Sequence, residues 1–255
     1  MRRVYRKNCA CPGTWLDSVQ KALPGYREFL RQATAFERLG LNSKVRRAGF
    51  FKFAPHVLVL DKRSGKPEFP AIWRKQKEII AAMSHRKCVY CEVPINAPSA
   101  AHVEHFKPKA LFPSSAYAWT NYFLGCPGCN VAKGQNWPKR GEYVRPDKGD
   151  PGRHFVFSKD GDMNAVKPSS SAAVMVEDFK LKRQWLVAQR RQNVEKMLNL
   201  LNEAVQLHRE GHEIQARRLA RTLLGTIDTP DQAYSAALTQ CFWRAWKRAC
   251  PGVRV

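Results

Sequence analysis

Apolar residues recur at helical spacing in the first part of the chain. Thr14 can cap a helix that Pro24-Gly25 stops, and a second helix is predicted over residues 26–39. Residues 56–61 resemble a short strand, whereas residues 70–83 carry an apolar face at helical spacing. The apolar positions behind these predictions are Trp15, Leu16, Val19, Leu23, Phe29, Leu30, Ala33, Phe36, Ile72, Ile79, Ile80 and Met83.

The last part of the chain is predicted to be helical from about Val174 onward. An apolar stripe over residues 181–205 predicts one long helix. A final helix is expected to begin with Thr229 as its cap, Pro230 at its first helical position and Gln232 closing a capping box. We expect this helical flank to have no catalytic role.

Between these helical parts the chain consists of short elements broken by Pro and Gly. The string HFVFSKDGDM predicts a hairpin that turns at Asp160-Gly161, and KPSSSAA at residues 167–173 predicts a loop or linker. The fold class is therefore α+β, with a compact core between mainly helical flanks. The three predicted regions are residues 1–85, 86–165 and 166–255.

The chain is strongly basic. Lys and Arg number 44 against 21 Asp and Glu, which gives a formal net charge of +23 at pH 7. The excess is +12 over residues 1–80, +4 over residues 81–150 and +7 over residues 151–255. This balance predicts a polyanionic partner, and the flanks are expected to bind a phosphate backbone or an acidic partner. The alternative is that much of the excess charge is ordinary solvated helix surface.

Nucleic acid is favoured over a membrane as that partner. The chain has no apolar run of about 18 residues and no leader with a cleavage site. A cytoplasmic location follows as an expectation. In that reducing compartment, paired cysteines are first interpreted as metal ligands.

Two C-x2-C pairs carry the strongest metal signal. Cys88 with Cys91, and Cys126 with Cys129, would supply four thiolates for one tetrahedral Zn²⁺. A redox role for either pair fits less well, because the pairs flank a His-rich segment. A zinc ion with four protein ligands has no open position for water, so this zinc is predicted to be structural.

Four cysteines remain outside these pairs. Cys241 and Cys250 are expected in helices, and Cys9 with Cys11 is a weak candidate for a second metal site. The segment between the pairs holds the other chemistry, in HVEHFKPK at residues 102–109 and NYFLGCPGCNVAKG at residues 121–134.

The order CVYCE, VEHFKPK, WTNYFLGCPGCN and AKG resembles HNH nucleases of the ββα-metal fold. By that resemblance His105 matches the general base and Glu104 the acidic metal ligand. Asn121 matches the central Asn of the HNH motif, and Asn130 takes the position of its final His. Glu replaces the commoner Asp, and Asn replaces the final His. Both are oxygen donors, so Mg²⁺ or Mn²⁺ is favoured at the catalytic position.

The chemistry of phosphodiester cleavage independently calls for this set. A neutral His can deprotonate water, and a cation stabilises charge on the phosphoryl oxygens. Asn121 would hold the loop that presents His105, and Lys133 would contact a phosphate. His102 is a further candidate for metal or substrate, with a structural or solvated role as the alternative.

One geometric difficulty follows from strand geometry. Adjacent strand residues point to opposite faces, so Glu104 and His105 cannot both face one site from a regular strand. They are expected where the strand ends, with Pro108 breaking it.

A wider resemblance covers most of the chain. The strings MRRVYRKNCACPGTWL, YVRPDKGDPGRHFVFSKDGDM and LKRQWLVAQRR, together with the motifs above, resemble the nuclease subunit of Septu-type anti-phage systems and its retron-associated relatives. The resemblance implies a bacterial protein that acts with an ABC-type ATPase subunit.

The leading hypothesis is an endonuclease for DNA in anti-phage defence. The alternatives are a zinc-dependent nucleic-acid or protein-binding module whose HNH site has decayed, and a nuclease that cleaves RNA or tRNA. A restriction or homing enzyme ranks lower, because no recognition module is visible in the sequence.

Overall fold

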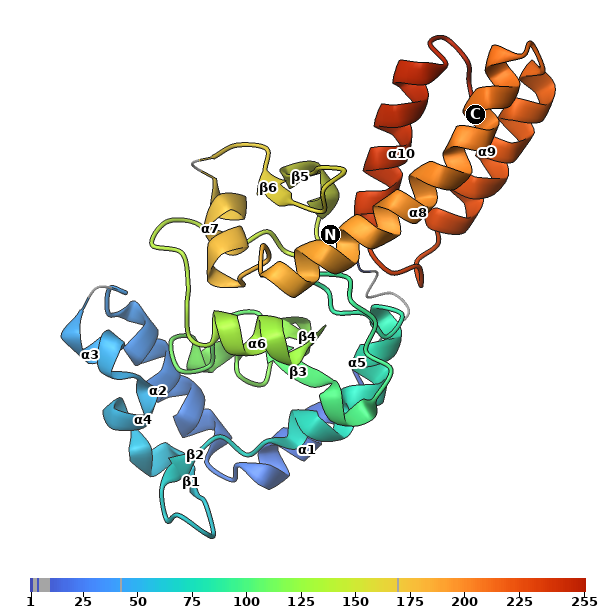
Figure 1. Cartoon of the computed structure of the whole chain (residues 1–255). Coiled ribbons are helices and arrows are strands. Elements are labelled where there is room, and N and C mark those ends of the chain that lie inside the picture. The colour runs from blue at the N-terminus through green and yellow to red at the C-terminus, as the bar shows by residue number, and fades with distance from the viewer. Residues whose placement is uncertain (2–3, 5–9, 42, 169) are drawn as a thin grey trace.

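The chain combines helices with three separate two-stranded antiparallel sheets, in agreement with the α+β prediction. The computed structural model describes residues 1, 4, 10–41, 43–168 and 170–255. In Figure 1 the first helices lie at one end, a hairpin with a short helix lies in the middle, and the last three helices project at the other end.

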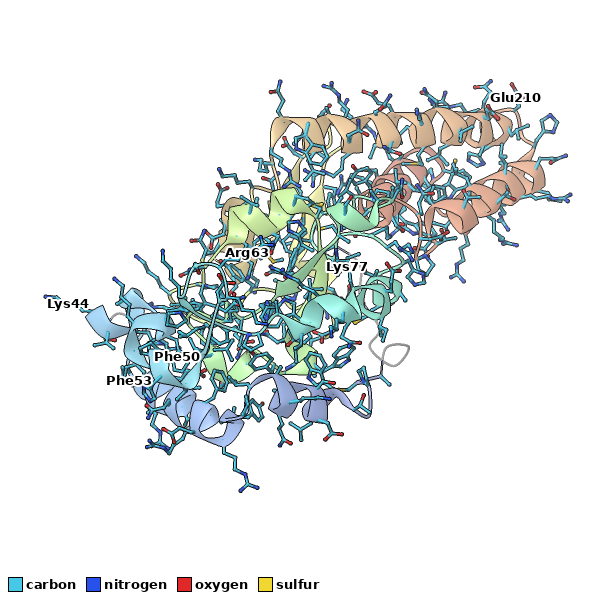
Figure 2. The ribbon with its side chains drawn as sticks, turned by 90° about the horizontal axis from the view of Figure 1, so that it is seen from below. Lys44, Phe50, Phe53, Arg63, Lys77 and Glu210 are labelled. Carbon is cyan, nitrogen blue, oxygen red and sulfur yellow. The ribbon has the colours of Figure 1, made fainter. Side chains whose placement is uncertain are left out.

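The first region is held together by aromatic side chains. Phe29 contacts Phe50 and Phe69 edge-on, with ring centroids 5.7 Å and 5.9 Å apart. Figure 2 labels Phe50 and Phe53 in this part of the molecule. The helices and turns here are α1 (Trp15–Ala22), α2 (Tyr26–Arg38), α3 (Lys44–Ala48), α4 (Phe50–Phe53), η2 (Pro55–Val57), η3 (Ile72–Gln76) and α5 (Lys77–Met83).

The predictions of helices after Thr14 and from Tyr26 are confirmed, but two others need correction. Only Val59–Leu60 of the predicted strand 56–61 is a strand, β1, which pairs with β2 (Pro67–Glu68), because the 3-10 turn η2 occupies residues 55–57. The segment 70–83 begins as the 3-10 turn η3 before α5, so Ile79 lies exposed rather than on the buried face.

The centre of the molecule is a hairpin followed directly by a helix. Strand β3 (His102–His105) pairs antiparallel with β4 (Tyr122–Gly125), and α6 (Pro127–Lys133) packs against β3. The register joins His102 to Gly125 and His105 to Tyr122. Short 3-10 turns fill the connections before and within the hairpin: η4 (Pro98–Ala100), η5 (Pro113–Ser115) and η6 (Trp119–Asn121).

The predicted hairpin at Asp160-Gly161 is confirmed. After the turn η7 (Pro151–His154), β5 (Phe155–Phe157) pairs antiparallel with β6 (Met163–Ala165). Gly161 has φ +86°, and a Cβ there would lie 2.2 Å from the carbonyl oxygen of Val187. Only glycine fits this turn, because a side chain would collide with the backbone of the long helix that covers it.

The tail is helical as expected, although its boundaries differ. It comprises α7 (Ser171–Asp178), α8 (Gln184–Arg209), α9 (Glu213–Ile227) and α10 (Ser235–Ala249), so part of the predicted linker 167–173 is helix. Figure 2 labels Glu210 at the far end of α8. In the described part of the chain no helix has both the length and the apolar character needed to cross a membrane.

The predicted start of the final helix at Thr229, Pro230 and Gln232 is wrong. Helix α10 begins at Ser235, where the backbone N–H of Ala236 donates to the carboxylate of Glu92 at 3.0 Å. The helix begins beside the distant Glu92 carboxylate, which supplies a negative charge at the helix N-terminus, and not at the local capping sequence of Thr229, Pro230 and Gln232.

Candidate metal centre and active site

Four buried cysteine sulfurs gather at the start of α6. The sulfur atoms of Cys88, Cys91, Cys126 and Cys129 all lie within 4.8 Å of one another. The Cys91 and Cys126 sulfurs are 3.8 Å apart, close to the separation of about 3.8 Å that tetrahedral zinc with bonds of about 2.3 Å imposes. The cluster could hold a zinc ion.

The local backbone explains how the sulfurs converge. Cys126 is the N-cap of α6, with Pro127 at the first helical position, and its sulfur accepts the Cys129 N–H at 3.5 Å. Cys88 and Cys91 lie in a turn before β3, where the N–H of Cys88 donates to the Val93 carbonyl. Burial raises the pKa of the Cys88 thiol, so a thiolate there requires a compensating cation.

Arg183 covers the cysteine cluster from the tail region. Its Nη2 lies 3.8 Å from the sulfur of Cys91, 3.7 Å from that of Cys126 and 3.4 Å from that of Cys129. Gly128 allows this approach, because a Cβ there would lie 3.2 Å from Nη2. A zinc with four thiolates carries a net charge of −2, so this guanidinium is a favourable neighbour.

On one face of the β3–β4 hairpin, His102 and Glu104 of β3 contact Asn130 and Lys133 of α6. The Glu104 carboxylate is 3% exposed and lies 2.5 Å from the Lys133 ammonium, which is itself 1% exposed. The same ammonium donates to the carbonyl of His105 at 2.7 Å. Asn130 Nδ2 lies 2.9 Å from His102 Nδ1. We call this set the α6 face.

Glu104 and Asn130 also pack close to the same residue, Gly125. A Cβ built on Gly125 would lie 3.3 Å from the Cβ of Glu104 and 3.7 Å from the Cβ of Asn130. A carboxylate and a side-chain amide offer oxygen donors of the kind that Mg²⁺ or Mn²⁺ takes. These residues therefore fit a divalent cation by donor type, although Lys133 already balances the charge of Glu104.

His105 lies on the opposite face of the hairpin, which we call the Trp73 face. Its ring is edge-on to Trp73, with centroids 4.5 Å apart, and to its cross-strand partner Tyr122 at 5.1 Å. Its Nε2 is 3.2 Å from the carbonyl oxygen of Ala116. Burial, with Lys109 and Lys133 nearby, lowers the pKa of His105 to about 3, so the ring is neutral near pH 7.

The alternation of strand residues thus applies to Glu104 and His105 as anticipated. Both belong to β3, and His105 is its last residue. The structure brings together Glu104, Asn130 and Lys133, whereas the ring of His105 packs on the other side of the strand. Lys133 is buried against Glu104 rather than exposed toward a substrate.

Asn121 ties down the loop that follows β3. Its Oδ1 accepts the N–H of Lys107 at 2.8 Å, and its Nδ2 donates to the carbonyls of Lys107 at 3.1 Å and Ser115 at 2.9 Å. The side chain is 3% exposed, so all these bonds are shielded from water.

Three side chains near these sites were missed from the sequence. Trp73 contacts His105, Lys109 lies over Trp73 and Arg183 covers the sulfurs. Lys109 stood inside the recognised string HVEHFKPK, but nothing in its spacing indicated an aromatic neighbour from residue 73. Arg183 is 54 residues from Cys129, so no local pattern could have indicated its position.

The remaining cysteines add no metal cluster within the described residues. Cys11 is exposed, Cys241 lies in α10 and Cys250 directly follows it. Cys9 lies outside the described residues, so the weak prediction for Cys9 with Cys11 stays a prediction.

The chain is similar to two proteins named Septu protein PtuB. The one from Bacillus thuringiensis is 34% identical over 88 residues, 33% of this chain and 34% of the relative. The one from Bacillus mycoides (strain KBAB4) is 26% identical over 144 residues, 45% and 49% of the two chains. The chain spans between a third and a half of the length of these curated relatives. No protein-family model matches it.

Proposed function

We propose that this protein is a metal-dependent endonuclease of the HNH type that hydrolyses phosphodiester bonds of DNA. The observation that carries the proposal is the packing of Glu104 and Asn130 against the same residue, Gly125, with His105 directly after Glu104 on β3. We treat residues 86–165 as the nuclease core, stapled by zinc at the four cysteines.

His105 is the proposed general base. Its ring is neutral, so it can accept a proton from water, and the contact of Nε2 with the Ala116 carbonyl leaves Nδ1 as the acceptor. The negative charge of a bound phosphodiester raises the pKa of a neighbouring imidazole toward neutrality. Asn121 positions the loop that carries Lys107 and the carbonyl of Ser115 near this strand.

Glu104 and Asn130 are the residues that would hold a divalent cation. When bound, Mg²⁺ or Mn²⁺ supplies charge stabilisation to the phosphoryl oxygens. The Glu104 carboxylate is paired with the Lys133 ammonium inside the protein. It must therefore bind the cation together with Lys133 or replace Lys133 by the cation. His102, bonded to Asn130, orients the amide from the same face.

A plasmid assay tests the proposal. Purified protein with Mg²⁺ or Mn²⁺ should cleave DNA, and His105→Ala should lose about 10²- to 10⁴-fold of the rate. His56→Ala is the control, because His56 is exposed in the first region. Equal rates in wild type and His105→Ala would contradict the assignment, provided that zinc content and melting temperature are unchanged.

The biological setting is also a proposal. The similarity to Septu protein PtuB supports a role in Septu-type anti-phage defence. The partner subunit in this proposal is the ABC-type ATPase that the sequence resemblance implies. Copurification of the tagged chain from its native host, followed by a nuclease assay of the assembly, tests this. Recovery of the chain without an ATPase subunit would count against the partner.

A second candidate function is a zinc-dependent binding module without hydrolysis. The buried pair of Glu104 with Lys133 and the separate face of His105 favour it. Such a module would bind nucleic acid in the same assay while both wild type and His105→Ala leave the plasmid intact. Parallel reactions with RNA and tRNA test the alternative of an RNA-cleaving nuclease, which would cleave these substrates and leave the plasmid intact.

A further inference from the structure

The cations around the hairpin differ in whether they have an anionic partner. Lys133 pairs with Glu104 at 2.5 Å, Lys107 with Glu142 at 2.7 Å and Arg145 with Asp147 at 2.9 Å. Each of these charges is balanced within the protein. Among the residues that the structure describes, no carboxylate lies within ion-pair distance of Lys109.

Lys109 is nevertheless held in place on the Trp73 face. Its Nζ lies 4.4 Å from the ring centroid of Trp73 and 5.6 Å from that of Phe69. Ring faces attract a cation but carry no net charge, so they position the ammonium without neutralising it. Burial and the positive charge of the exposed Arg74 lower the pKa of Lys109, and Glu68 opposes this from beyond ion-pair distance.

An unbalanced and partly desolvated cation is costly for a protein to hold. Trp73 joins this cation to His105, because its ring contacts the imidazole at 4.5 Å and the ammonium at 4.4 Å. An anion that met the ammonium would therefore share the Trp73 ring with the proposed general base, and the Lys109 charge is near enough to act on the His105 ring. Lys133, the phosphate contact expected from the sequence, is buried and paired with the Glu104 carboxylate, so it offers no free charge to an anion.

We propose that Lys109, supported by Trp73 and assisted by Arg74, is an anion site that binds the phosphodiester backbone of nucleic acid beside His105. The proposal rests on the proposed function and names the residue that binds its substrate.

Binding is measured on the full chain without added Mg²⁺, using a labelled DNA duplex over a series of salt concentrations. Each phosphate contact contributes about 0.9 to the slope of log K against log salt on duplex DNA. Lys109→Gln keeps the stem over Trp73 but removes the charge. It should lower the magnitude of the slope by about 0.9 and weaken binding at least about fivefold.

Two variants control this measurement. Lys109→Arg keeps the charge and should retain the wild-type slope. Lys196→Gln removes an exposed charge on α8 and should leave the slope unchanged. A wild-type slope in Lys109→Gln would overturn the proposal, because a merely structural lysine would not alter the number of phosphate contacts.

A second measurement needs no variant and so does not depend on folding. Wild-type protein is acetylated with an amine-reactive ester, with and without the duplex, and each lysine is followed by mass spectrometry. DNA should slow the modification of Lys109 several-fold but not that of Lys196. Equal rates at Lys109 with and without DNA would overturn the site, and an RNA duplex of the same sequence tests whether both nucleic acids share it.

The failure of this site and the failure of the proposed function give different results. A protein that binds DNA through Lys109 but never cleaves plasmid with Mg²⁺ has the anion site without the hydrolysis. A protein that cleaves plasmid while Lys109→Gln retains the wild-type slope has the hydrolysis without this site.

Discussion

The two faces of the β3–β4 hairpin hold similar residue types in different electrostatic states. On the α6 face, Glu104 and Lys133 neutralise each other inside the protein. On the Trp73 face, His105 is neutral and Lys109 lacks an ion-pair partner among the described residues. Internal pairing balances the charge on the first face, whereas the ammonium on the second face is left to meet an outside anion.

The largest expected effect is the loss of the framework that supports both faces. Cys126→Ser should prevent metal binding and folding, because a structural zinc contributes about 10–16 kcal/mol in small zinc domains. Metal analysis should find one zinc per wild-type chain, and thermal unfolding should find no cooperative transition in the variant. Cys11→Ser, at an exposed thiol, is the control. A soluble and folded Cys126→Ser would remove the structural-zinc argument.

The next effect tests the paired state of the α6 face. Lys133→Met should lower the free energy of unfolding by about 3–5 kcal/mol, because it leaves a buried carboxylate without its partner. Glu104→Gln combined with Lys133→Met should recover part of this loss in denaturant unfolding. Lys139→Met, at an exposed lysine, should be nearly neutral. Additive losses in the double variant would mean that the two side chains do not interact.

A smaller effect is expected at the guanidinium over the cysteines. Arg183→Met should weaken zinc retention about 10- to 100-fold, as the loss of a residue next to a metal's ligands commonly does. The rate of zinc release to a coloured chelator measures it. Arg191→Met changes an exposed arginine on α8, the helix that Arg183 directly precedes, and should release zinc at the wild-type rate. Equal release from both variants would rule out a role for Arg183.

The smallest effect concerns pH on the Trp73 face. Burial and Arg74 lower the pKa of Lys109 to about 8, against an opposing influence of Glu68. The ammonium is charged below that pH and neutral above it, while His105 stays neutral throughout this range. DNA binding should therefore weaken about three- to tenfold between pH 7 and pH 9.

The Lys109→Arg variant sharpens this pH test, because arginine keeps its charge up to pH 9. Its binding should change less than that of wild type over the same pH range. The same decline in both proteins would assign the pH effect to other groups.

Much of the local structure could be predicted from the chain. The helices after Thr14 and from Tyr26 and the turn at Gly161 follow from short-range periodicity and turn chemistry. The start of α10 could not, because the Glu92 carboxylate, 144 positions from Ala236, sets it. Short patterns fail where a distant side chain supplies the cap.

By itself the sequence determined the two C-x2-C pairs as metal ligands, and its resemblance to HNH nucleases implied a hairpin followed by a short helix. Each cysteine pair depends on a spacing of two residues, which a tight turn converts directly into geometry. Only the tertiary structure decided that Lys133 neutralises Glu104, that Arg183 covers the sulfurs and that Trp73 supports Lys109 beside His105. These contacts join residues on separate elements, and the balance of charge at each depends on which groups the fold removes from water together.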